Sequence, residues 1–296
     1  EHTVELLKSM KPEHEYFMGI DSDGCVFPTM EIKQKECFHP AIIEYWKLEP
    51  IAEYLRETAQ FVNLYSRWRG SNRSPALART FDLLRERPEV VESEIKVPEL
   101  TALKRWTASE TQLSNETLED CVNRTGDAEL RKVLDWSREI TRRVRDRVRG
   151  VGPFKNVRET LTKAGQRADL IVVSQTPAEA LEREWEEHQI RKSVRLIAGQ
   201  ELGTKEEHLR FATAGKYHPD KILMVGDALG DLQAADCSGA LFYPIIPGRE
   251  EEYWKKLHSE ALDRFFSGRF AGDYQRALRE ELVSSLSSVP PWMKER

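Results

Sequence analysis

Short runs of apolar residues occur once near the start of the chain and repeatedly in its second half. They cover residues 16–20, 170–173, 194–198, 222–225 and 240–246, and most end at glycine, proline or a polar residue. Because these runs lack a clean alternation of apolar and polar positions, they suit strands buried on both faces. Segments of helical length, such as 177–190 and 204–214, separate the later runs. The pattern therefore predicts βαβ units and a doubly wound parallel sheet.

The middle of the chain, residues 31–149, has a different pattern. Charged segments there carry apolar residues at helical spacing, and strand-like runs are nearly absent. The turn-rich sequence at 150–153 then returns the chain to the earlier pattern. We predict an α/β core formed by residues 1–32 and 150–296, with a mainly helical cap domain inserted as residues 33–149. After Pro247 we expect two or three amphipathic helices that end at Pro290-Pro291.

Composition narrows the class of protein. The 296 residues are 40% hydrophobic, which is enough for a core and an insertion, and the formal net charge is −5. This charge does not indicate nucleic acid or a membrane surface as a partner, and no apolar run approaches the ~20 residues that span a bilayer. Four cysteines lack metal-type spacing, so we expect free thiols and a cytoplasmic location.

Polar side chains stand where the predicted strands end. Asp21 and Asp23 follow the first strand, Ser174 follows the second, and Asp227 and Asp231 follow the fourth. Ligands of open parallel sheets bind beyond the carboxyl ends of the strands, so these side chains are expected to share one site. A lone DxD pattern is weak, because each aspartate could be a helix cap or a turn former. The combination of DxDG and GDxxxD after two strands is much stronger.

These motifs carry a family resemblance. The segment Asp21-Ser22-Asp23-Gly24-Cys25-Val26-Phe27 matches DxDGxxF, Ser174 ends an apolar strand, and Asp227 and Asp231 match GDxxxD. In this order, they resemble the motifs of the haloacid dehalogenase superfamily of phosphotransferases. The resemblance implies a lysine some twenty-odd residues before the last motif. Lys205 fits that spacing better than Lys216, which is the alternative.

The resemblance and the needs of phosphoryl transfer imply a mechanism. Asp21 would attack phosphorus as a carboxylate nucleophile, and Asp23 would protonate the leaving group and then activate water. Lys205 would offset negative charge, and the Ser174 hydroxyl would donate to a phosphoryl oxygen. Ser174 could also cap the following helix. Cys25, beside this loop, is expected to be a small packed residue.

A hard cation is the expected cofactor, because carboxylate and carbonyl oxygens suit Mg²⁺ and no cluster of histidine and cysteine is present. Its ligands would be the carboxylates of Asp21 and Asp227 and the backbone carbonyl of Asp23. Asp231 would bind the ion directly or through water, unless it only caps a helix.

The predicted activity is a magnesium-dependent phosphatase that hydrolyses a small phosphorylated metabolite through an aspartyl-phosphate. Asp23 argues against a dehalogenase or a phosphonatase of the same superfamily, which lack an acid at that position. A phosphomutase uses the same residues and is the alternative enzyme. A catalytically weak binding or regulatory protein is the alternative from another class. The sequence identifies neither the substrate nor the oligomeric state.

One further feature lies in the predicted cap. The stretch from residue 61 to residue 81 contains four arginines and no carboxylate, in a chain that is acidic overall. Guanidinium groups suit phosphate and carboxylate, so Arg67, Arg69 and Arg73 are candidates for substrate binding. The alternative is an exposed basic helix end, or ion pairs with the acidic segment 86–94.

Overall fold

The computed structural model describes residues 4–294, and these divide into two compact units. One unit contains residues 4–30 and 150–286, and the other contains residues 31–149 and 287–294. The predicted boundaries lie close to these, except at the end of the chain. The first three and the last two residues of the predicted core lie outside the described residues. None of the helices in the described part of the chain is long and apolar enough to cross a membrane.

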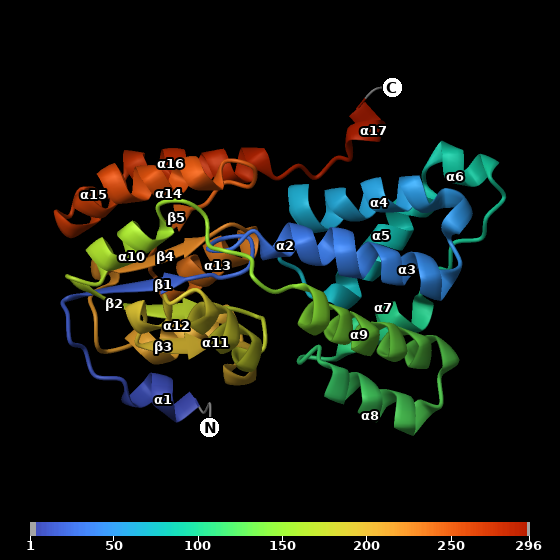
Figure 1. Ribbon diagram of the computed structural model, residues 1–296, viewed down its shortest axis with the longest axis horizontal. Coiled ribbons are helices and arrows are strands. Elements are labelled where there is room, and N and C mark those ends of the chain that lie inside the picture. The colour runs from blue at the N-terminus through green and yellow to red at the C-terminus, as the bar shows by residue number, and fades with distance from the viewer. Residues whose placement is uncertain (1–3, 295–296) are drawn as a thin grey trace. The chain divides into compact units, whose positions relative to one another are not determined.

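The first unit contains a five-stranded parallel sheet in the order β3-β2-β1-β4-β5 (Figure 1). Its strands are β1 Tyr16–Ile20, β2 Ala168–Val173, β3 Leu196–Ala198, β4 Ile222–Gly226 and β5 Leu241–Pro244. All residues of β1, β2 and β4 are buried, which explains why their sequences are apolar apart from Asp169 in β2. The direction of growth reverses after β3, so right-handed crossovers put helices on both faces. This confirms the predicted doubly wound α/β core.

Helices of several lengths cover this sheet. Among them, α12 and α13 pack on each other and α13 packs on β4, whereas α10 packs against α14 and α16 packs along β5. A π-helical segment, Leu257–Ala261, joins α14 to α15. The helices of the first unit are α1 Val4–Ser9, α10 Val157–Ala164, α11 Ala178–Glu187, α12 Lys205–Thr213, α13 Leu229–Ser238, α14 Glu250–Lys256, α15 Leu262–Phe266 and α16 Asp273–Ser285.

In the described part of the second unit, the regular elements are helices joined by loops, apart from an isolated bridge between Ser66 and Ser287. Its core is a separate hydrophobic cluster in which Trp46 packs edge-on against Phe81 and Trp136. The short helix α2, Thr29–Ile32, leads into a π-helical segment, Lys33–Phe38. A second π-helical segment, Phe61–Tyr65, follows α4. The other helices are α3 His39–Trp46, α4 Ala52–Gln60, α5 Arg73–Arg85, α6 Pro88–Glu92, α7 Thr101–Ser109, α8 Asn115–Thr125 and α9 Ala128–Arg147.

The end of the chain differs from the sequence prediction. Residues 287–294 group with the helical unit and not with the α/β core. The backbone N–H of Arg67 donates to Ser287 at 3.1 Å, and Trp292 packs against Phe61 and under Arg87. Pro291 begins helix α17, Pro291–Lys294, so the prediction that the two prolines end the helices was wrong. A proline fits the first turn of a helix because the N–H that it lacks would have no partner there.

Candidate active site

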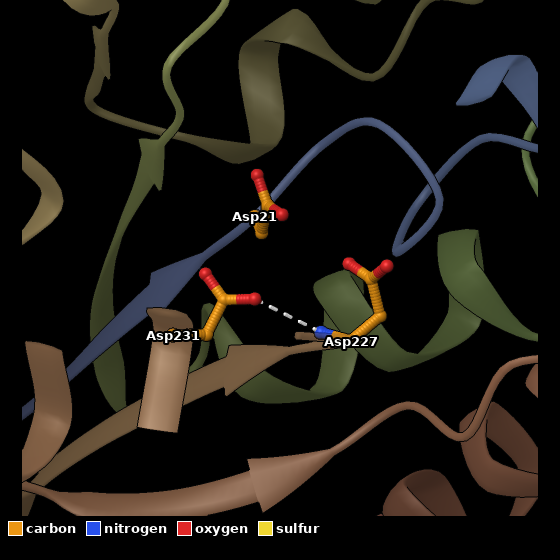
Figure 2. A group of neighbouring side chains, drawn as sticks. All are labelled: Asp21, Asp227 and Asp231. Carbon is orange, nitrogen blue, oxygen red and sulfur yellow. Dashed lines mark hydrogen bonds between the residues drawn. The ribbon is translucent and has the colours of Figure 1, made fainter. Parts of the chain in front are cut away.

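Two neighbouring strands bring the aspartates together. In the register of β1 and β4, Ile20 lies opposite Val225, and the N–H of Asp21 donates to the carbonyl of Val225 at 2.9 Å. These two strands form the topological switch point of the sheet, where a crevice opens at the carboxyl ends. Figure 2 shows Asp21, Asp227 and Asp231 gathered at this edge of the sheet. All three side chains are buried.

The loop after β1 is a tight turn built on Ser22. The Ser22 carbonyl accepts hydrogen bonds from three following N–H groups, those of Cys25, Val26 and Phe27. Gly24 has φ of +79°, a conformation that favours glycine, which explains the fourth position of the DxDG motif. The indole N–H of Trp185 donates to the Ser22 hydroxyl at 3.0 Å. Cys25 is fully buried in the core beneath this turn, in agreement with its predicted packing role.

Asp231 supports the loop that carries Asp227. One of its oxygens, Oδ2, accepts the backbone N–H groups of Asp227 and Ala228 at 3.1 and 3.0 Å, just before α13 begins. Figure 2 shows the first of these two hydrogen bonds. A Cβ atom at Gly226 would lie 2.4 Å from the Asp231 side chain, so only glycine fits there. Asp231 therefore binds backbone N–H groups at the start of α13, as the helix-cap alternative predicted. Its binding to a metal ion stays a prediction.

The structure separates the two candidate lysines. Lys205 is the first residue of α12, and its ammonium lies 2.9 Å from Asp21 and 2.6 Å from Asp231. A capping box between Thr204 and Glu207 starts this helix and fixes the place of Lys205. Lys216 instead donates to the backbone carbonyls of Leu7 and Phe211.

The charges in this cluster are unbalanced, since three buried carboxylates face one ammonium. Burial raises the pKa of Asp21 well above its ordinary value, Lys205 opposes this, and Asp231 and Asp227 add to it. For Lys205, burial lowers the pKa, but the nearby Asp21 and Asp231 outweigh it and the pKa is raised. The site therefore holds excess negative charge, which another cation would offset.

The donor set fits a divalent hard cation. Asp21, Asp227 and Asp231 each offer one carboxylate oxygen, and these three oxygens lie within 4.8 Å of one another. All are oxygen donors, the ligand type that Mg²⁺ prefers. The residues present therefore suit the predicted cofactor.

Asp23 lies on the same turn as Asp21 and is held by two hydroxyl groups. Thr29 donates to its Oδ1 at 2.5 Å, and Thr176 donates to its Oδ2 at 2.6 Å. Neither threonine was predicted from the sequence. Thr176 could have been noticed as a second hydroxyl in the loop that follows Ser174, whereas no pattern distinguishes Thr29. The Ser174 hydroxyl accepts the N–H of Thr176 at 3.2 Å. The N-cap residue of α11 is Pro177, so the alternative that Ser174 caps this helix was wrong.

Comparisons with known proteins add to this geometry. The family described as "Haloacid dehalogenase-like hydrolase" matches residues 99–243, which include Ser174, Lys205, Asp227 and Asp231. The remaining motif, DxDG at Asp21, directly follows β1, the strand that pairs with β4 in the same sheet. Over residues 99–243 the chain is similar to the haloacid dehalogenase-like hydrolases. Among curated proteins, no significant match was found.

Solved structures of haloacid dehalogenase-like proteins share the fold. A predicted phosphoglycolate phosphatase from Haemophilus somnus 129pt is 16% identical, with a TM-score of 0.50 over 79% of this chain and 86% of that one. A protein of Bacteroides fragilis named as a haloacid dehalogenase-like hydrolase is 14% identical, with a TM-score of 0.50 over 80% of this chain and 92% of the other. At these identities the likeness establishes the fold.

The three arginines proposed from the sequence for substrate binding have different surroundings. Arg67 is exposed. Arg69 is buried and donates to the carbonyl of Leu64 at 2.8 Å. Arg73 donates from one nitrogen to the carbonyl and hydroxyl of Ser137 and to the hydroxyl of Thr141, which joins the start of α5 to α9. Two of the three therefore make hydrogen bonds inside the helical unit.

Proposed function

We propose that the protein is a magnesium-dependent phosphatase that hydrolyses a small phosphorylated metabolite through an aspartyl-phosphate on Asp21. The observation that carries the proposal is the position of Asp21, with Lys205 at 2.9 Å and the carboxylates of Asp227 and Asp231 beside it. The name of the Haemophilus somnus protein as a predicted phosphoglycolate phosphatase agrees with it. Since all four cysteines are free thiols, we propose a cytoplasmic location.

Each side chain then has a role in the reaction. The Asp21 carboxylate attacks phosphorus in line with the leaving oxygen, and Lys205 offsets the negative charge of the equatorial oxygens. Ser174 donates its hydroxyl to one of those oxygens. Asp23 gives its proton to the leaving alkoxide and takes a proton from the water that attacks the acyl phosphate. Asp21, Asp227 and the Asp23 carbonyl would hold Mg²⁺, with Asp231 as a further or water-mediated ligand. The ion would supply positive charge against the phosphoryl group.

The substrate side of the proposal concerns the helical unit. Because Arg69 and Arg73 are engaged in hydrogen bonds there, Arg67 is the best of the three candidates for contact with an anionic or hydroxylated leaving group. Arg67 is exposed, and its backbone is fixed by Ser287.

The decisive experiment measures phosphate release from a panel of phosphorylated metabolites, with Mg²⁺ and with chelator. We expect release by the wild type with Mg²⁺ and none by Asp21→Asn, because an amide is a poor nucleophile. Asp236→Asn is the matched control, since this carboxylate on α13 is exposed and pairs with Arg279. Equal release by wild type and Asp21→Asn would refute the mechanism. Transfer of phosphate between positions of one substrate, with a bisphosphate activator, would indicate the phosphomutase instead.

A further inference from the structure

Both carboxylate oxygens of Asp23 accept a threonine hydroxyl, and the two threonines come from different parts of the core. Thr29 follows on the same chain segment, at the start of α2. Thr176 is 153 residues away in sequence and lies in the loop after β2. The two loops meet because β1 and β2 are parallel neighbours, with Ile20 opposite Val172.

The loop that carries Thr176 is held at several points. The N–H of Thr176 donates to the Ser174 hydroxyl, and its carbonyl accepts the N–H of Gln200 at 3.1 Å. Next to it, the Gln175 side chain donates to the carbonyl of Gly203 at 2.9 Å, and Glu201 accepts the N–H of Ala178. The Thr176 hydroxyl is therefore a fixed donor, aimed at a carboxylate that could otherwise rotate.

We propose that Thr176 is a positioning residue for Asp23, and this rests on the proposed phosphatase function. The terminal torsion of an aspartate is broad, so its own rotamer preference does not set the plane of the carboxyl group. The hydrogen bond from Thr176 to Oδ2, together with that from Thr29 to Oδ1, sets that plane. A general acid must be aligned with the oxygen that it protonates, and small misplacement reduces its effect. Thr176 acts through Asp23 and does not contact the phosphoryl group.

A purely structural role explains Thr176 less well. Its side chain is only partly buried, so its hydroxyl could be satisfied by water without a protein partner. The backbone hydrogen bonds of the loop do not depend on the hydroxyl. Replacing the hydroxyl by a methyl group should therefore leave the loop in place and remove one of the two threonine hydroxyls that orient the carboxyl group.

The test compares Thr176→Val with Thr176→Ser in single-turnover release of two leaving groups. An alkyl phosphate needs protonation of its leaving oxygen, whereas 4-nitrophenyl phosphate has a good leaving group and needs little. We expect Thr176→Val to slow alkanol release by about tenfold, the scale of one charge-assisted hydrogen bond, and 4-nitrophenol release by less than about twofold. Thr176→Ser should restore most of the rate. Thr162→Val, which removes an exposed hydroxyl bonded only within α10, is the matched control.

Two further measurements sharpen the outcome. In an Asp23→Asn background, Thr176→Val should cause no additional loss, because the group that it positions is already disabled. A crystal structure of Thr176→Val should show the Asp23 carboxyl rotated and the loop unchanged. Equal losses for both leaving groups, or an unmoved Asp23, would overturn the assignment. If the wild type releases neither leaving group with Mg²⁺, the proposed function fails and the assignment fails with it. If the wild type releases both leaving groups but Thr176→Val does not selectively slow alkanol release, the function stands and the role assigned to Thr176 is wrong.

Discussion

The ammonium of Lys205 lies 2.9 Å from the carboxylate of Asp21, and both groups are at the carboxyl edge of the sheet. Lys205→Met should lower kcat by about 10² to 10³, the scale for loss of one electrostatic donor in an active site. Lys216→Met is the matched control, because the Lys216 ammonium donates to the backbone carbonyls of Leu7 and Phe211 and not to a carboxylate of the site. Steady-state phosphate release checks both variants. A larger loss in Lys216→Met than in Lys205→Met would reverse the assignment.

Asp23→Asn should reduce turnover by roughly 10² to 10⁴, the usual range for a general acid or base. The second half of the reaction also needs this carboxylate, so the phosphorylated form of Asp21 should accumulate. Mass spectrometry of the variant, quenched during turnover, would detect the added phosphoryl group. Turnover within about twofold of the wild type would exclude Asp23 from the proton transfers.

Metal binding should be visible without catalysis. Mg²⁺ that binds the folded state alone raises the melting temperature in proportion to the logarithm of its concentration. In Asp227→Asn we expect this rise to be lost, while the metal-free variant melts higher than the metal-free wild type because one buried negative charge is gone. Differential scanning calorimetry across a Mg²⁺ series measures both effects. An unchanged Mg²⁺ response in Asp227→Asn would remove this residue from the ligand set.

Two buried histidines should make the fold sensitive to mild acid. Burial lowers the pKa of His39 and of His208 to about 4, and nearby cations act in the same direction. The unfolded chain therefore takes up protons first, near its ordinary pKa of 6.5, and stability is lost as the pH falls from about 6.5 toward 4. The expected loss is roughly 2 kcal/mol per histidine at about pH 5.

Urea unfolding at about pH 7.5 and about pH 5 would measure this dependence. His39→Leu and His208→Leu should each reduce the difference between the two conditions, whereas His218→Leu, at an exposed position, should not. An identical pH dependence in all four proteins would show that other groups cause the acid sensitivity.

Substitution of the three cap arginines by alanine should have different effects on stability and on KM. Arg69→Ala and Arg73→Ala remove hydrogen bonds from charged donors inside the helical unit, so each should lower stability by about 1–3 kcal/mol. Arg67→Ala should leave stability within about 0.5 kcal/mol and raise KM for the true substrate more than for an aryl phosphate. Denaturation curves and KM values for both substrates check these expectations. A KM effect confined to Arg69→Ala or Arg73→Ala would move the substrate contact to that residue.

Much of the α/β core could be predicted from the sequence. The run at residues 16–20 became β1 with the same bounds, and the other four runs became strands within a few residues. Strands buried on both faces need a continuous apolar sequence, so the pattern carries the information locally. The DxDG and GDxxxD motifs could also be recognised from the sequence, because each needs a glycine for a local reason. Gly24 has a positive φ in its turn, and a side chain at Gly226 would collide with Asp231.

Other features were decided only by tertiary structure. These features depend on which side chains meet across long stretches of chain. They are the contact of Lys205 with Asp21, the hydroxyls that hold Asp23, and the different hydrogen bonds of the three arginines. The end of the chain groups with the helical unit because Trp292 packs against Phe61 and Arg87. No local sequence pattern predicts these contacts. Periodicity records how each element is buried. It does not record which partner a polar side chain meets, because that partner is set by register and crossover geometry.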